Sequence, residues 1–185
     1  MELPNVGLVG AGRIARILLN GWARAGALPG RVVACDINSA ACEALRSVCA
    51  HLEASTEASL ACRQEVVFLA VHPPVIKDVA PVLKQHLAPE STLVSLAPKL
   101  TLAKLTEMLG GFARIARVIP NAPSLVGRGF NPVAFGPGLP GDARRDLEHL
   151  LAPLGDCPEV PEEHLEAYAI LAAMGPTYSG PSCMP

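Results

Sequence analysis

The chain has 185 residues, of which half are hydrophobic and 17% are charged, with a formal net charge of −2. This length can bury one good-sized core with a small appendage, but not two full domains. The charge balance lacks the excess that nucleic acids and membrane surfaces select, so we expect neither as a partner. The apolar runs are far shorter than the roughly 20 residues of a membrane span, and no basic region followed by an apolar core opens the chain. We therefore expect a cytoplasmic protein.

Strand and helix patterns alternate along the chain. Short apolar runs predict strands at 5–9, 31–36, 65–71, 92–96 and 113–119, with weaker strands at 50–54 and 132–135. Helical patterns cover 40–50, 56–62, 73–86, 101–109, 142–154 and 162–173, and a short extended piece is expected at 157–160. Fully apolar strands that alternate with helices predict an α/β fold, in which a parallel sheet is covered on both faces.

The connection after the first predicted strand carries the most informative motif. Residues 10–15 read Gly-Ala-Gly-Arg-Ile-Ala, a Gly-x-Gly-x-x-Ala turn between a strand and a helix. Gly10 permits a sharp turn, Gly12 lets the backbone approach a pyrophosphate, and the small Ala15 lets the helix lie close to the strand. The helix N-terminus then offers free N–H groups to phosphate oxygens. The motif predicts a dinucleotide-binding unit and a Rossmann-type doubly wound sheet.

Asp36 ends the second predicted strand, at the distance from the glycines where the ribose-binding carboxylate of such folds lies. A carboxylate there accepts the adenosine ribose hydroxyls and repels a 2′-phosphate, which favours NAD over NADP. Asp36, Asn38 and Ser39 also precede a helical stretch and could cap that helix. Both roles can be true, because they use neighbouring residues. Because Asn38, Ser39 and Arg13 could receive a phosphate, we expect NAD or NADP as cofactor, with a preference for NAD.

Four segments resemble the pyrroline-5-carboxylate reductase family, whose members make proline from a cyclic imine. They are the glycine turn, Ala-Val-His-Pro-Pro at 70–74, Arg-Val-Ile-Pro-Asn-Ala-Pro at 117–123, and the stretch from Leu-Gly at 154–155 to Gly-Pro-Thr-Tyr at 175–178. The resemblance implies a nicotinamide-dependent reductase acting on an imine or related carbonyl compound. It also implies a dinucleotide-binding domain at 1–160 and the start of a helical dimerisation domain at 161–185.

The resemblance further implies a cofactor site built from several loops. In the family, a Val-x-Pro turn and a Pro-Asn-x-Pro segment line the nicotinamide end, a role that falls here to Val71, His72, Pro73, Pro120 and Asn121. The predicted cofactor-binding residues are Gly10, Ala11, Gly12, Arg13, Ile14, Asp36, Asn38, Val71, His72, Pro73 and Asn121. An iminium is already electrophilic and needs no strong general acid, so no residue is assigned a catalytic role.

The chain departs from the family at several places. It has His72 in place of a Lys, Ala-Pro-Lys at 97–99 in place of Ala-Ala-Gly, and an apolar stretch at 169–176 in place of a hydroxyl-rich substrate segment. The lost hydroxyls favour a larger or more apolar imine or carbonyl substrate. The family is homo-oligomeric and continues with dimerising helices after the tyrosine that matches Tyr178. We therefore expect a truncated member, with a truncated C-terminal helical segment, that is inactive alone or prone to self-association.

Two other functions are consistent with parts of the sequence. The apolar stretch at 169–174 fits a non-catalytic module that binds NAD(P) without turnover. A deazaflavin-dependent NADP oxidoreductase or a hydroxy-acid dehydrogenase is a weaker alternative, against which the Pro-Asn-Ala-Pro segment argues. The six cysteines have no C-x-x-C spacing and the five histidines are scattered, so we expect buried thiols and no metal site.

Overall fold

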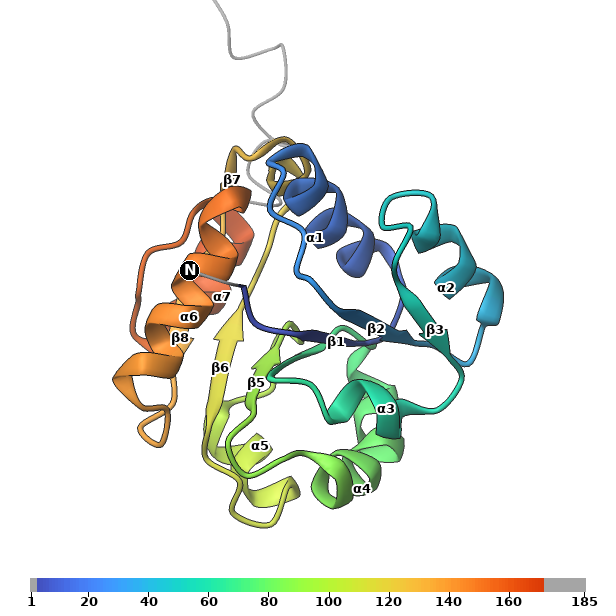
Figure 1. Cartoon of the computed structure of the whole chain (residues 1–185). Coiled ribbons are helices and arrows are strands. Elements are labelled where there is room, and N and C mark those ends of the chain that lie inside the picture. The colour runs from blue at the N-terminus through green and yellow to red at the C-terminus, as the bar shows by residue number, and fades with distance from the viewer. Residues whose placement is uncertain (1–2, 172–185) are drawn as a thin grey trace, which may run out of the picture.

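The computed structural model describes residues 3–171, which form a sheet with helices on both faces (Figure 1). Seven strands follow the order β3-β2-β1-β4-β5-β6-β8. All neighbouring strands are parallel except β6 and β8, which are antiparallel. The strands are β1 Val6–Val9, β2 Val32–Cys35, β3 Glu53–Ser55, β4 Val66–Leu69, β5 Thr92–Ser95, β6 Ile115–Val118 and β8 Val133–Phe135. This order confirms the predicted Rossmann-type sheet, with its switch point between β1 and β4.

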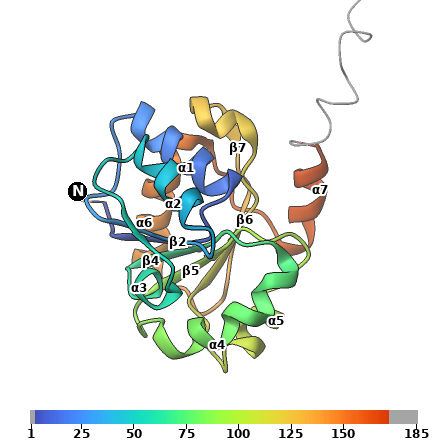
Figure 2. The same ribbon diagram turned by 90° about the vertical axis from the view of Figure 1, so that its right-hand side faces the viewer.

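The helices divide between the two faces of the sheet (Figures 1 and 2). One face packs on α1 Arg13–Arg24, α2 Ser39–Arg46 and α6 Gly141–Leu151. The other packs on α3 Ala58–Cys62, α4 Ile76–His86 and α5 Leu102–Met108. The chain then reaches α7 Leu165–Ala169. Short 3-10 turns are η1 Pro73–Val75, η2 Ala122–Val126, η3 Ala152–Leu154 and η4 Glu162–His164, and a second small sheet pairs β7 Gly129–Phe130 with β9 Gly155–Asp156.

Several predicted boundaries shift for identifiable reasons. The helix expected at 73–86 opens as the 3-10 turn η1, which has Pro73 and Pro74 at its start, because a proline disfavours the α conformation of the residue before it. Pro153 likewise ends α6 at Leu151, and the chain continues as η3. The extended piece expected at 157–160 forms only one isolated bridge, between Val133 and Glu159. The last part of the helix predicted at 162–173 lies outside the described residues, and the domain boundary at 160 stays a prediction.

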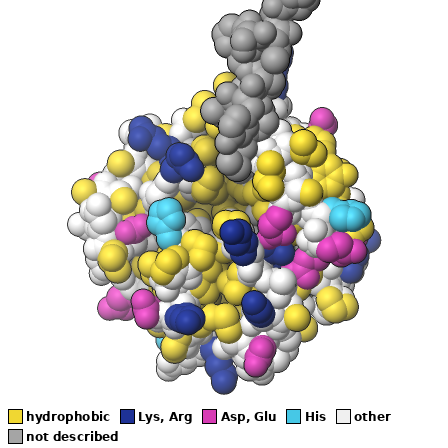
Figure 3. Space-filling model, turned by 180° about the vertical axis from the view of Figure 1, so that it is seen from behind, with side chains coloured by type: hydrophobic (Ala, Val, Ile, Leu, Met, Phe, Trp, Pro, Cys, Tyr) yellow, Lys and Arg dark blue, Asp and Glu magenta, His cyan; other side chains and the backbone are white. Residues whose placement is uncertain are grey.

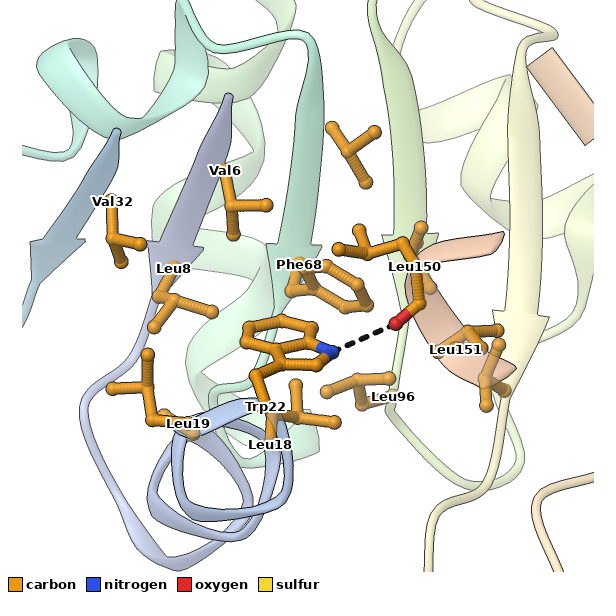
Figure 4. Packing of buried hydrophobic residues seen from close by; sticks show 14 of the residues in the cluster. Val6, Leu8, Leu18, Leu19, Trp22, Val32, Phe68, Leu96, Leu150 and Leu151 are labelled. Atoms are coloured by element: carbon orange, nitrogen blue, oxygen red, sulfur yellow. Dashed lines mark hydrogen bonds between the residues drawn. The ribbon is translucent and has the colours of Figure 1, made fainter. Parts of the chain in front are cut away.

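The larger core cluster is centred on Trp22 of α1, which is fully buried (Figure 4). Its indole Nε1 donates a hydrogen bond to the carbonyl oxygen of Leu150 at 2.8 Å, and its ring centroid lies 5.8 Å from that of Phe68. These contacts join α1 to β4 and α6, so the helix that follows the glycine turn is fixed rigidly against the sheet. Within residues 3–171 no helix is long and apolar enough to cross a membrane.

Candidate functional site

The glycine turn is wedged between the ends of two strands. Gly10 has φ +105°, and a Cβ atom there would lie 2.8 Å from the carbonyl carbon and oxygen of Ala70. Its N–H donates to the carbonyl oxygen of Cys35 at 2.8 Å. A side chain at this position is therefore excluded both by the backbone conformation and by the neighbouring chain. The contact places the turn directly beside the segment that follows β4.

At Gly12, unlike at Gly10, neither the backbone conformation nor a neighbouring protein atom excludes a side chain. Its φ is −77°, which any residue can adopt, and a Cβ atom there would meet no protein atom within 4 Å. Gly12 is the N-cap of the twelve-residue helix α1 and makes no side-chain cap hydrogen bond. The exposed Arg13 and the half-buried Ile14 follow. The start of α1 thus borders an open space that a side chain would fill, which fits a bound pyrophosphate.

Asp36 joins the end of β2 to this turn. Its Oδ2 accepts a hydrogen bond from the backbone N–H of Ala11 at 2.8 Å, and its Oδ1 accepts one from the N–H of Asn38 at 2.9 Å. The cap of α2 is Asn38, whose Oδ1 accepts from the N–H of Ala40 at 3.1 Å. Of the three residues that could cap α2, Asn38 is therefore the cap, and Asp36 is not. Each carboxylate oxygen keeps further acceptor capacity.

The segment after β4 lies next to the glycine turn, as the Gly10 contact shows. Val71 is half-buried, whereas His72 and Pro73 are exposed. The carbonyl oxygen of His72 accepts a hydrogen bond from the N–H of Val75 at 2.9 Å, which starts η1. The structure thus brings the predicted phosphate-binding and nicotinamide-side segments together at one edge of the sheet.

Asn121 follows β6 and lies in a buried polar network. Its Oδ1 accepts from the N–H of Phe130 at 3.2 Å and from the hydroxyl of Ser124 at 3.5 Å. The Oδ1 of Asn131 accepts from the Asn121 N–H at 3.3 Å and from the Ser124 hydroxyl at 2.6 Å. Sequence reasoning missed Ser124 and Asn131, both 0% exposed. The network holds the loop around η2, and a cofactor contact by Asn121 stays a prediction.

A second charged cluster, which sequence reasoning also missed, surrounds Arg117 of β6. This side chain is 2% exposed, and it pairs with Glu162 through Nη1 at 2.9 Å and with Glu166 through Nη2 at 2.6 Å. Glu162 Oε1 also accepts from the N–H of Leu102, and Glu166 Oε1 accepts from the N–H of Lys99 at 2.9 Å. Burial opposes the charged form of Glu166, but the hydrogen bonds from Arg117 and Lys99 outweigh it and lower its pKa. An arginine in an otherwise apolar strand was the available signal.

The carboxyl ends of the parallel strands lie on the side of the molecule that carries α7. Figure 2 shows α7 and the N-terminus on opposite sides, and Figure 3 views the α7 side. Its middle is mostly hydrophobic, with scattered basic side chains and a group of acidic ones. The predicted site segments all follow strands at this edge. Such a surface suits a ligand with both apolar rings and a few charged groups.

The described cysteines are packing residues. Burial raises the pKa of the Cys35 thiol to about 11 and that of Cys62 to about 12. Thiols with such values are almost entirely protonated near neutral pH and are poor nucleophiles. Within residues 3–171 no group of three or more His, Cys, Asp or Glu side chains is placed to hold a metal ion. Cys183 lies outside the described residues.

The strand order and the glycine turn are those of the class of dinucleotide-binding domains. Residues 5–99, just over half of the chain, match the family described as NADP oxidoreductase, coenzyme F420-dependent. The chain belongs to this family. The pyrroline-5-carboxylate reductases, which its four motifs resemble, are similar to it over nearly all of its length. The family description covers only the first half of the chain, whereas the relatives below match nearly all of it.

Among the relatives, pyrroline-5-carboxylate reductase 3 of Macaca fascicularis is 32% identical over 179 residues, which are 92% of this chain and 62% of that protein. A pyrroline-5-carboxylate reductase structure from Coxiella burnetii has a TM-score of 0.87 and 26% identity, covering 96% of this chain and 66% of that one. The reductase of Plasmodium falciparum, solved with NADP bound, shares the fold at 22% identity and a TM-score of 0.82, with 96% and 65% covered. The chain spans slightly less than two thirds of these relatives.

Proposed function

We propose that this chain binds a nicotinamide dinucleotide at the carboxyl edge of its sheet, as part of a reductase that transfers hydride to an imine or a related carbonyl compound. The observation that carries the proposal is the open space beside Gly12 at the start of α1, with Asp36 hydrogen-bonded to the same turn. The names of the relatives, and the NADP bound in one of them, support it.

Each predicted segment has a distinct part in this proposal. The backbone of residues 10–14 holds the pyrophosphate at the positive end of the α1 dipole. Asp36 and Asn38 face the adenosine ribose, and Val71, His72, Pro73 and Asn121 form the nicotinamide side. When bound, the reduced nicotinamide supplies the hydride. The chain's own residues orient the two reactants and exclude water, and no residue is assigned to proton transfer.

The proposal includes a preference for NAD over NADP. Asp36 places a negative charge beside the glycine turn, and a 2′-phosphate in that position is repelled. Both carboxylate oxygens already accept backbone N–H groups, so the side chain is held in place before a ribose arrives. The exposed Arg13, which directly follows Gly12, is the positively charged candidate for an opposing attraction to a phosphate, in addition to Asn38 and Ser39.

The substrate proposal follows the relatives' names with one modification. The imine is cyclic, as in pyrroline-5-carboxylate, and an apolar variant of it is favoured because Ala169 offers no hydroxyl. Ala172 and Met174, on which that expectation also depends, lie outside the described residues. A cytoplasmic location and a homo-oligomeric assembly, in which a second copy completes the site, belong to the proposal.

The test is oxidation of NADH, followed by its absorbance, with pyrroline-5-carboxylate and a panel of apolar cyclic imines and ketones. Turnover that is abolished by Gly12→Ala supports the reductase. Tight NADH binding with no turnover on the whole panel supports instead a non-catalytic NAD(P)-binding module. Absence of binding to either nicotinamide cofactor contradicts both.

A further inference from the structure

The turn after β5 contains a strained residue. Lys99 has φ +63°, and it is the one non-glycine residue with positive φ in the part of the chain that the structure describes. A left-handed conformation costs a residue with a Cβ atom roughly 1 kcal/mol. The turn reads Ala97-Pro98-Lys99, where the sequence resemblance places a glycine at the third position. Lys99 therefore has the left-handed backbone conformation that glycine adopts most easily.

Charged side chains from far along the sequence hold this turn. The N–H of Lys99 donates to Glu166 Oε1 at 2.9 Å, and the same oxygen accepts from Arg117 Nη2 at 2.6 Å. Arg117 Nη2 also lies 3.5 Å from the carbonyl oxygen of Ala97. The nearly buried guanidinium of Arg117 thus holds the Ala97 end of the turn directly and the Lys99 end through Glu166. The strain at Lys99 is offset by these charge-assisted hydrogen bonds.

The turn also borders the proposed nicotinamide side. Strand β5 lies between β4 and β6, and the N–H of Leu96 donates to the carbonyl oxygen of Leu69 at 3.1 Å. Of the two strands beside β5, β4 leads into the segment at 71–73 and β6 leads into Asn121. A change in the path of residues 97–99 would move the edge of the sheet between these two segments.

We propose that Glu166 is a positioning residue, which holds the Lys99 turn in its left-handed conformation and so keeps the nicotinamide-side edge in the geometry that hydride transfer requires. Glu166 acts through the N–H of Lys99 and through Arg117, and it transfers no proton. The functional half of this inference rests on the proposed reductase activity. The structural half, that Glu166 fixes the turn, stands independently of it.

The experiment compares Glu166→Gln, Lys99→Gly and the double variant with a matched control, Glu53→Gln. Glu53 pairs with Arg31 at 2.9 Å at the amino ends of β2 and β3, away from the site, and both side chains are about half exposed. Three quantities are measured: the exchange rate of the Lys99 amide hydrogen by NMR, the Kd for NADH, and kcat with the imine that the wild-type chain reduces.

We expect Glu166→Gln to speed exchange of the Lys99 amide and to lower kcat about tenfold, with the Kd for NADH within about twofold of wild type. Lys99→Gly in the Glu166→Gln background should restore most of kcat, because glycine adopts the left-handed conformation without strain. Glu53→Gln should change none of the three. If Glu166→Gln does not fold, Glu166→Asp provides the same comparison.

Glutamine keeps a side-chain oxygen that accepts hydrogen bonds, so Glu166→Ala, which removes the acceptor of the Lys99 N–H, is measured alongside it. Unchanged protection of the Lys99 amide in Glu166→Ala would overturn the structural half. An equal loss of kcat in the single and double variants would overturn the role of the turn in positioning. If the wild-type chain binds NADH but reduces no imine, the proposed function fails, and the exchange measurement still decides whether Glu166 fixes the turn.

Discussion

The carboxylate of Asp36 accepts a hydrogen bond from the backbone N–H of Ala11 at 2.8 Å, across 25 residues of sequence. The bond ties the end of β2 to the turn after β1. The residue that is proposed to accept the ribose hydroxyls is thus also a support of the pyrophosphate turn. Cofactor binding and local stability are therefore coupled through one side chain.

Replacing Asp36 tests this coupling. Asp36→Ala leaves the N–H groups of Ala11 and Asn38 without their acceptor and should lower the free energy of unfolding by about 1–2 kcal/mol. It should weaken NADH binding at least tenfold and weaken NADPH binding less, because the repulsion of the 2′-phosphate is removed as well. Urea unfolding followed by Trp22 fluorescence and cofactor titration check the two parts. Equal losses for NADH and NADPH would contradict the proposed ribose role.

The two glycines of the turn should respond differently to alanine. Gly12→Ala meets no protein atom within 4 Å and keeps an ordinary φ, so it should cost less than about 1 kcal/mol of stability. It should nevertheless abolish binding of NADH, because the new methyl group fills the space proposed for the pyrophosphate.

Gly10→Ala is the matched comparison. Its positive φ and the close backbone of Ala70 should destabilise the fold by more than about 2 kcal/mol. Thermal unfolding of both variants without cofactor checks the difference. A Gly12→Ala protein that binds NADH as tightly as wild type would show that the open space has another use.

The network around Asn131 predicts a stability effect. Asn131→Ala removes the oxygen that accepts from the Asn121 N–H at 3.3 Å and from the Ser124 hydroxyl at 2.6 Å, and the loss of these buried hydrogen bonds should lower the free energy of unfolding by about 1–3 kcal/mol. Urea unfolding is the measurement. The same variant should weaken cofactor binding only if Asn121 contacts the cofactor, so unchanged binding in a folded variant would argue against that predicted contact.

Acid should weaken the attachment of Glu166. Its pKa in the folded chain is lower than its ordinary value of 4.5, so the folded state binds protons less readily than the unfolded state. This contribution to stability is complete above the ordinary pKa and is lost as the pH falls through the lower, folded-state pKa.

The check compares wild type with Glu166→Gln, as free energies of unfolding from about pH 7 to about pH 3. The difference between the two proteins should be largest near neutral pH and should shrink on acidification. A constant difference across this range would show that ionisation of Glu166 contributes no pH dependence to stability.

The features that depend on residues close together in the sequence were predicted correctly. The alternation of apolar strands with helices predicted a parallel sheet, and the strand and glycine motif at 5–15 predicted the turn at the right place. The cap of α2 was ambiguous, because Asp36 and Asn38 are both good caps, and the distant N–H of Ala11 decided which one is free to cap. That contact is invisible in a sequence window.

The missed features depend on contacts between remote segments. Arg117 binds Glu162 and Glu166, which lie 45 and 49 residues later, so no spacing rule could pair them. The left-handed Lys99 could not be predicted either, because glycine is the usual residue there and only the partner Glu166 explains the exception. The two-residue strands β7 and β9 are too short to show the alternation of apolar and polar residues that predicts a strand.

The most direct test of the account is a titration of the chain with NADH and with NADPH, followed by cofactor fluorescence and by thermal unfolding. A ligand that binds only the folded state raises the Tm by mass action. We predict that NADH binds at least about tenfold more tightly than NADPH, a difference near 1.4 kcal/mol, and that Gly12→Ala removes both the binding and the rise in Tm. Binding of neither cofactor, or equal binding by wild type and Gly12→Ala, would contradict the assignment of the glycine turn as the cofactor site.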